Sequence, residues 1–129
     1  MTARISLLGA AIAIALLSAG PALANGHVAK GKKVFAKCRA CHVVDQAKNK
    51  VGPHLNGLFG RTAGTVEKYK YSKAMKAKGE GGLVWTEETL TEYLANPRAY
   101  VKGTKMAFRG LKKPGQIKNL IAYLKEAGS

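Results

Sequence analysis

The sequence predicts an all-α fold in which a few helices are separated by long loops. The clearest helix follows Pro114, where apolar residues recur at intervals of three, one and three positions: Ile117, Leu120, Ile121 and Leu124. No segment has the alternating apolar and polar pattern of a half-buried strand. Residues 43–71 show neither period and contain several glycines, so we expect a long irregular segment there.

The first 24 residues have the composition of a secretory signal peptide. Arg4 precedes an apolar run over residues 5–17, and the small residues Ala22-Leu23-Ala24 form a cleavage site before Asn25. The apolar run is shorter than the ~20 residues that cross a bilayer, which disfavours an uncleaved membrane anchor. We therefore expect cleavage after Ala24, export from the cytoplasm, and one mature domain over residues 25–129 with no stable membrane insertion.

The mature chain begins with a segment that predicts a helix over residues 26–41. Its apolar and small residues share a face, and lysines occupy the other faces; the shared face holds Val28, Gly31, Val34 and Phe35. Because glycine lowers helix stability, Gly31 either allows another helix to approach closely or is merely tolerated.

Two further helices have recognisable ends. Residues 72–79 predict a short helix before the loop Glu80-Gly81-Gly82. Thr86 is a good N-cap followed by two acidic residues, and Asn96-Pro97 is a good helix stop. The helix between them places Leu90 and Leu94 on one face.

The most specific motif is Cys38-Arg39-Ala40-Cys41-His42. Two thiols three residues apart, followed directly by an imidazole, suit covalent attachment of one haem c: each sulfur bonds one vinyl group, and His42 is left against the iron. The alternatives are a disulfide, a thioredoxin-like redox pair and a zinc half-site. A thioredoxin-like pair would follow a strand, which the basic segment before Cys38 does not resemble. A zinc site would need two more ligands, and only His27 and His54 remain.

The chain is strongly basic. It carries 22 Lys and Arg against 7 Asp and Glu, a net charge of +15, and removal of the signal peptide takes away only Arg4. Such a charge predicts electrostatic steering towards an acidic protein, an anionic membrane surface or nucleic acid. The lysines are scattered singly with no basic tail, and nucleic acid is a poor partner for an exported protein, so a protein partner is favoured.

Segments spread over nearly the whole mature chain resemble class I cytochrome c, of the cytochrome c2 or mitochondrial-like type. They are residues 31–35, 38–42, 51–61, Trp85, 94–97, 102–108 and 120–125. The resemblance implies a monomer whose N- and C-terminal helices cross and whose long loops wrap around one haem c.

The resemblance implies that Met106 is the sixth ligand of the haem iron, opposite His42. A thioether is a weak donor that favours ferrous iron, so this ligand pair raises the reduction potential. From the residues alone the choice stays open: Met75, His27 and His54 are alternatives, and a methionine in an apolar pattern usually serves packing.

The resemblance also implies roles for residues around the haem. The Pro53 carbonyl would accept the other N–H of His42, although Gly-Pro also fits an ordinary turn. Tyr93 would hydrogen-bond near the Met106 sulfur, or is a core tyrosine. Phe108 would cover the haem near its exposed edge. Buried haem propionates need donors, which the resemblance places at Arg61, Tyr71, Trp85 and Thr104. Read singly, Trp85 also fits an ordinary core residue, and Arg61 also fits a solvated charge on the surface.

Three departures from the family pattern limit this transfer of roles. The segment from Phe35 to Cys38 has the shorter bacterial spacing, and Glu80-Gly81-Gly82 resembles an insertion. Met75 and Lys102 stand where the family often has asparagine and proline. Lys102 loosens the loop that carries Met106, because a fixed φ is lost there. The adjacent amine of Lys105 is a candidate to replace the sulfur at high pH.

These observations predict a soluble periplasmic one-electron carrier and not an enzyme, since both axial positions are filled. We expect exposed basic residues to ring the haem edge and dock acidic partners: Lys33, Lys37, Lys50, Arg98, Lys105, Lys112 and Lys113. By resemblance the donor is a cytochrome bc1-type complex, and the acceptor a terminal oxidase, a photosynthetic reaction centre or a periplasmic reductase. The alternative is a haem protein with an open sixth position that acts on peroxide or a gas, for which His54 is the only candidate acid-base residue.

Overall fold

The computed structural model describes residues 26–129, so the expected signal peptide and its cleavage site lie outside the described residues. The helices are α1 (Val28–Phe35), α2 (Lys73–Glu80), α3 (Glu87–Ala95), α4 (Pro97–Tyr100) and α5 (Pro114–Ala127). Within residues 26–129 the only extended pairing is an isolated bridge between Thr62 and Val84. The prediction of an all-α fold is confirmed.

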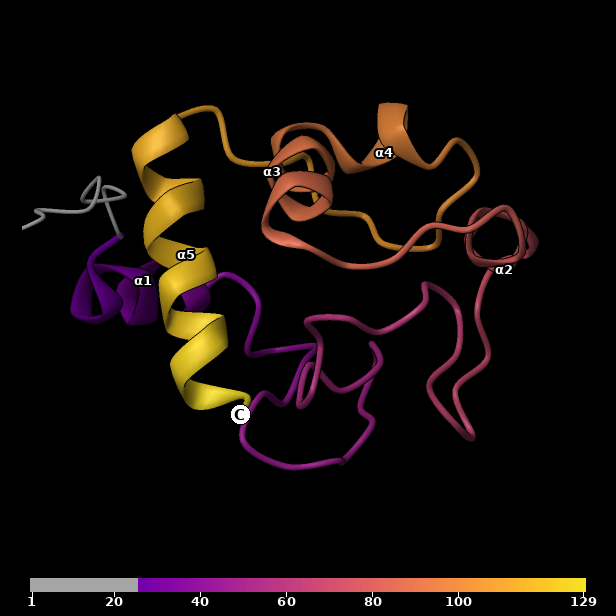
Figure 1. Ribbon diagram of the computed structural model, residues 1–129, viewed down its shortest axis with the longest axis horizontal. Helices are drawn as coiled ribbons and strands as arrows, with labels where there is room; N and C mark the ends of the chain where they lie inside the picture. The colour runs from indigo at the N-terminus through magenta and orange to yellow at the C-terminus, as the bar shows by residue number, and fades with distance from the viewer. Residues whose placement is uncertain (1–25) are drawn as a thin grey trace, which may run out of the picture.

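The two ends of the described chain pack against each other, because α5 crosses in front of α1 (Figure 1). Gly31 lies at this crossing, where a Cβ atom would come within 1.9 Å of the Asn119 carbonyl oxygen. The rings of Phe35 and Tyr123 pack beside it with centroids 5.3 Å apart. Of the two readings of Gly31, close approach of a second helix is therefore the correct one.

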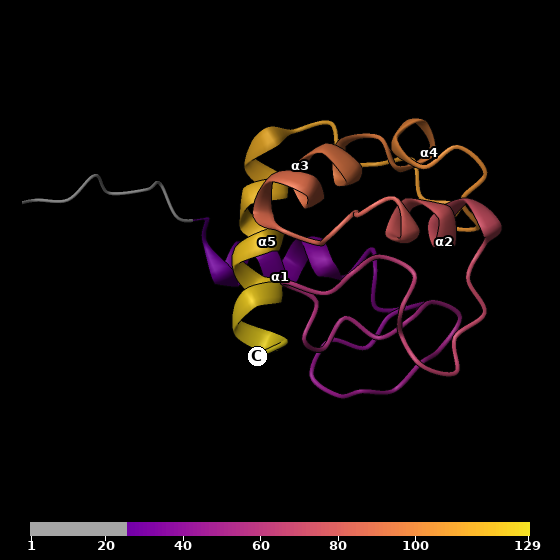
Figure 2. The same ribbon diagram turned by 45° about the vertical axis from the view of Figure 1, so that its right-hand side comes forward.

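The remaining elements frame the space beside this helix pair. Figure 1 shows α3 and α4 along one side, α2 at the end remote from α5, and the irregular segment before α2 along the opposite side. After a turn of 45°, Figure 2 shows the same segment looping below α2 and α3. None of the helices between residues 26 and 129 is both long and apolar enough to cross a membrane.

The helices α2, α3 and α4 each begin after a residue whose side chain caps the first turn. Ser72 accepts a hydrogen bond from Met75 N at the start of α2, and Thr86 forms a reciprocal capping box with Thr89 at the start of α3. Asn96 caps α4, a one-turn helix that was not predicted from the sequence. The first helix is shorter than the predicted range 26–41, because turns with bonds such as Cys41 N to Cys38 O replace it after Phe35.

The irregular segment 43–71 is held by contacts between parts far apart in the chain. Asn49 Nδ2 donates to the Glu67 carbonyl over 3.0 Å, and its Oδ1 accepts from His54 N over 3.0 Å. The Tyr69 hydroxyl donates to the Val51 carbonyl over 2.9 Å. These bonds fix loops that have no regular secondary structure of their own.

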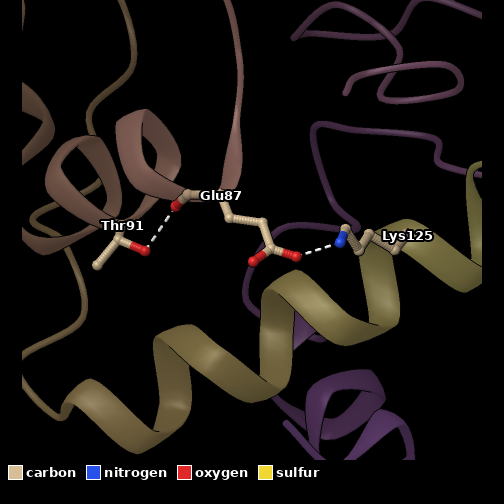
Figure 3. A network of polar contacts seen from close by, with 3 residues as sticks. All are labelled: Glu87, Thr91 and Lys125. Atoms are coloured by element: carbon tan, nitrogen blue, oxygen red, sulfur yellow. Dashed lines mark hydrogen bonds and ion pairs between the residues drawn. The ribbon is translucent and has the colours of Figure 1, made fainter. Parts of the chain in front are cut away.

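The buried side chains form one core, to which the crossing helices, α2, α3 and the irregular segment all contribute. Its most buried members include Val101, Leu111, Leu120 and Leu90, each no more than 4% exposed. An ion pair between Lys125 of α5 and Glu87 of α3 spans the edge of this core (Figure 3). Both side chains are about half exposed, so the pair adds little to stability.

Candidate haem-binding site

A cavity of about 750 Å³ opens between the helices and the irregular segment. Apolar side chains from several elements line it, among them Leu58, Leu94 and Leu120. Every residue expected to hold the cofactor or its iron also lines it: Cys38, Cys41, His42, Pro53, Arg61, Tyr71, Trp85, Tyr93, Thr104, Met106 and Phe108. Residues from distant parts of the sequence therefore meet at one predominantly apolar cavity.

The two cysteines reach the cavity through the turns that follow α1. Cys38 N donates to the Phe35 carbonyl over 2.8 Å, and both thiols are half-buried and free. Burial raises the pKa of Cys38 to about 11, so it is a neutral thiol at physiological pH. Within residues 26–129 no third His, Cys, Asp or Glu side chain joins them as a zinc site would require.

His42 is held in one orientation by its surroundings. Its Nδ1 lies 2.7 Å from the Pro53 carbonyl oxygen, and because a carbonyl only accepts, Nδ1 carries the hydrogen and Nε2 has the free lone pair. Burial, with the nearby charges of Arg61 and Lys50, lowers the pKa of the imidazole and keeps it neutral, against the opposing effect of the Pro53 bond. A Cβ atom on Gly52 would come within 2.4 Å of His42 Cε1, so only glycine fits against the ring.

Met106 supplies a half-buried thioether to the same cavity. The Tyr93 hydroxyl donates a weak hydrogen bond to its sulfur over 3.8 Å. Met106 N donates to Thr104 Oγ1 over 3.4 Å, a local bond within the loop that carries both residues. Trp85 packs on Tyr93 with ring centroids 4.9 Å apart, and burial raises the pKa of Tyr93 to about 12.

One cationic side chain is partly buried at the cavity. Arg61 donates to the His54 carbonyl over 2.9 Å and to the Asn56 carbonyl over 3.3 Å. Its charge lowers the pKa values of both His42 and Tyr71, which places it near both side chains. A positive charge in this position suits an anionic group of a bound cofactor.

The expected docking residues are all exposed, but they do not lie equally close to the cavity. Lys37 and Lys105 line it directly, and Lys105 Nζ donates to the Lys70 carbonyl. The others lie outside its lining: Lys33, Lys50, Arg98, Lys112 and Lys113. Several of these donate to main-chain carbonyls, as Lys50 does to Arg39 over 2.9 Å.

Among the alternative iron ligands, only Met75 lines the cavity; His27 and His54 do not. Met75 is 8% exposed and faces inward from α2 together with Gly79. Its placement follows from Ser72, which caps α2 and also lines the cavity. Ser72 and Tyr69 line the cavity as well, although neither was among the predicted site residues. Ser72 had a recognisable signal as a helix N-cap, whereas Tyr69 lies in a segment without any period.

The donors present fit a covalently bound haem. Two free thiols, an imidazole with an open Nε2 and a thioether share one apolar cavity, and the guanidinium of Arg61, which has no acidic partner among residues 26–129, lies at its wall. A bound haem would supply an iron that alternates between the ferrous and ferric states.

Comparisons with known proteins agree with this geometry. Residues 28–128 match the family model described as Cytochrome c. The chain is 62% identical over 99 residues to cytochrome c2 of Afifella marina, with 76% of this chain and 80% of that protein covered. It is 53% identical over 101 residues to cytochrome c2 of Agrobacterium tumefaciens, with 78% and 91% covered.

A solved structure has the same arrangement of elements. Cytochrome cH from Methylobacterium extorquens superposes with a TM-score of 0.71 at 43% sequence identity, covering 78% of this chain and 99% of the other. The expected class I cytochrome c fold is thereby confirmed. The chain belongs to the cytochrome c family, and it is an electron-transfer protein with one covalently bound c-type haem rather than an enzyme.

Proposed function

We propose that His42 and Met106 are the two axial ligands of the haem iron and that Cys38 and Cys41 form the thioether bonds. The observation that carries the proposal is the single cavity lined by these four side chains, in which the Nε2 atom of His42 is free and its Nδ1 is engaged. With both axial positions filled by the protein, the reaction is limited to transfer of one electron.

The surrounding residues tune and shield the site. The Pro53 carbonyl orients the His42 ring and makes its Nε2 a stronger donor. Tyr93 draws electron density from the Met106 sulfur through its hydrogen bond. We assign the haem propionates to Arg61, Tyr71, Trp85 and Thr104, and the cover of the haem edge to Phe108; all five residues line the cavity.

We propose that the chain is exported to the periplasm and cleaved after Ala24. The bacterial cytochrome c2 relatives and the composition of residues 1–24 support this location. The donor is a cytochrome bc1-type complex, and the acceptor is a terminal oxidase, a photosynthetic reaction centre or a periplasmic reductase. The protein docks as a monomer through its exposed basic residues, with no nucleic acid involved.

The optical spectrum of the exported, haem-loaded protein tests the ligand assignment. We expect a six-coordinate low-spin spectrum, a sulfur-to-iron band that disappears in Met106→Ala, and no change on adding carbon monoxide. Met75→Leu is the matched control, because Met75 lines the same cavity, and it should keep the band. A high-spin spectrum with ready carbon monoxide binding would instead favour an open site that acts on peroxide or a gas.

The docking proposal is tested by the ionic-strength dependence of electron transfer to an acidic redox partner. The second-order rate should fall steeply as salt is added, because exposed charges are screened beyond about 10 Å at 0.1 M salt. Lys37→Glu should lower the rate more than the charge-matched Lys118→Glu, since Lys37 lines the cavity and Lys118 is exposed on α5 away from it. Equal effects of the two variants would contradict docking at the haem edge.

A further inference from the structure

Met75 is a buried thioether at the haem cavity to which the proposed ligand set gives no role. It belongs to the hydrophobic core, and Tyr93, Thr104 and Met106 line the same cavity. It stands at a position where the family often has asparagine. The fold therefore accepts a polar side chain here, and packing of the core does not by itself require a methionine.

Contacts before and after Met75 fix its position on α2. Met75 N donates to the Ser72 side chain over 3.0 Å. A Cβ atom on Gly64 would lie 3.1 Å from the Met75 carbonyl oxygen. At the other end of the helix, a Cβ atom on Gly79 would lie 1.8 Å from the Ala63 carbonyl oxygen. These close backbone contacts leave α2 little room to shift, so the thioether stays at the cavity wall.

The loop that carries the proposed sixth ligand rests on the start of α2. A Cβ atom on Gly103 would lie 3.4 Å from the Ala74 Cβ, which is ordinary van der Waals contact. Lys105 Nζ donates to the Lys70 carbonyl, just before the helix begins. Met75 therefore belongs to the element that supports this loop, and its side chain lines the end of the cavity that the loop closes.

The polar groups at this end of the cavity have partners among themselves. The Tyr93 hydroxyl donates to the Met106 sulfur over 3.8 Å, and Met106 N donates to Thr104 Oγ1 over 3.4 Å. Within residues 26–129 the one buried side-chain nitrogen or oxygen without a hydrogen bond is His54 Nδ1, which lies outside the cavity lining. A thioether has no N–H or O–H and accepts only weakly, so Met75 offers no strong partner to an entering water or polar ligand.

We infer that Met75 is a specificity-determining residue that keeps the Met106 end of the cavity closed to water and to small polar ligands. The inference rests on the proposed ligation by His42 and Met106. An imidazole that displaced the sulfur would bury its second N–H at a place where Met75 provides no strong acceptor, and the lost hydrogen bond weakens its binding. The protein thereby keeps its own thioether as ligand, and the site transfers electrons instead of taking up small molecules.

The test is a titration of the ferric, haem-loaded protein with imidazole, followed by the loss of the sulfur-to-iron band. Met75→Asn is the main variant, because the family accepts asparagine at this position. Its amide supplies an acceptor and leaves space that methionine fills, so imidazole should bind on the order of three- to tenfold more tightly, the equivalent of one hydrogen bond. Met75→Leu is apolar and similar in size, and its affinity should stay within about twofold of the unchanged protein.

Leu55→Asn is the matched control, because it places the same amide elsewhere in the cavity lining. Leu55 is half-buried, and a Cβ atom on Gly128, directly after α5, would lie 3.0 Å from its carbonyl oxygen. Figure 1 shows α2 at the end of the molecule remote from α5. Leu55→Asn should lose stability to urea and still bind imidazole as the unchanged protein does.

The outcomes separate this inference from the proposed ligation. Equal imidazole affinities in Met75→Asn and Met75→Leu, or an equal gain in Leu55→Asn, would overturn the role of Met75 alone. Absence of the sulfur-to-iron band from the unchanged protein would overturn the ligation by Met106 and this inference with it. If Met75→Asn does not load haem, Met75→Gln, which is closer to methionine in size, gives the same comparison.

Discussion

The hydroxyl of Tyr93 lies 3.8 Å from the sulfur of Met106 and donates a hydrogen bond to it. This bond joins α3 to the loop that carries Met106, and it lowers the electron density that the sulfur can give to a metal. In the proposed site, the strength of the Met106 ligand is thus set by a residue that does not itself bind the iron.

Removing that hydrogen bond should lower the reduction potential. In Tyr93→Phe the sulfur becomes a better donor, ferric iron is stabilised, and we expect a fall on the order of tens of millivolts. Redox titration of the haem-loaded protein measures it. An unchanged or raised potential would show that the hydroxyl does not act on the sulfur.

The same tyrosine should make the protein sensitive to alkali. Burial raises the pKa of Tyr93 from 10.0 to about 12, an effect that the nearby Thr104 hydroxyl partly offsets. Because the folded state holds this proton more tightly, the stabilisation is complete below pH 10 and is lost as the pH rises to 12. We expect the free energy of unfolding to fall by roughly 2–3 kcal/mol in this window from Tyr93 alone. Urea titrations at several pH values should show that the free energy of unfolding depends less on pH in Tyr93→Phe than in the original protein. The same pH dependence in both proteins would contradict a raised pKa of Tyr93 as the cause.

Gly31 should tolerate no side chain. The Cβ atom of Gly31→Ala would lie 1.9 Å from the Asn119 carbonyl oxygen, so the helices must separate, and we expect a loss of about 3 kcal/mol or more. Gly115→Ala in α5 is the control, because nothing lies within 4 Å of its Cβ position; it should stabilise the protein by roughly 0.5 kcal/mol. Urea unfolding compares the two variants. Equal stabilities would mean that the crossing adjusts freely.

Gly52 should be equally restrictive, but its replacement should affect the iron site. A Cβ atom there would lie 2.4 Å from His42 Cε1 and would push the ring away from the Pro53 carbonyl. We expect Gly52→Ala to give a mixed-spin or poorly haem-loaded protein. The nearby Lys48→Ala, at an exposed side chain outside the cavity lining, should leave the spectrum unchanged. A normal low-spin spectrum in Gly52→Ala would show that the ring position is not critical.

Asn49 should account for much of the stability of the irregular segment. Asn49→Ala loses the bonds to the Glu67 carbonyl and from His54 N, and we expect a cost of about 1–3 kcal/mol. Asn49→Asp keeps an acceptor for His54 N but sets an oxygen against the Glu67 carbonyl, so it should recover at most half of the loss. Hydrogen exchange of residues 49–67 should rise in both variants, while exposed Lys48→Ala serves as the control. Unchanged exchange in Asn49→Ala would rule out this role.

The sequence predicted the helices that begin with a recognisable N-cap residue or with a proline in the first turn. The start of α3 at Thr86 and of α5 at Pro114 followed from local chemistry that does not depend on the rest of the molecule. The helix α4 was missed because Asn96-Pro97 was interpreted only as a stop, whereas the same pair caps and begins a new turn. The first helix was predicted too long, because its apolar period continues into turns that present the two cysteines.

The residues of the candidate site likewise fall into those that a local sequence pattern predicts and those that it does not. The pentapeptide from Cys38 to His42 predicts its chemistry from spacing alone. The location of Met106 depended on a resemblance, since no local pattern connects it to His42. The role of Asn49 was not predictable, because its bond to Glu67 joins positions 18 residues apart in a segment without any period.

The crossing of α1 and α5 fixes the order of events during synthesis. His27 and Asn119, which bond across that crossing, are 92 positions apart, so the first helix has no partner until the last has been made. A chain grows from its N-terminus, and the two cysteines emerge long before α5 can close over the segment that holds them. The late arrival of α5 therefore leaves an interval in which both thiols stay accessible, and a group as large as a haem can be attached before the fold closes around it.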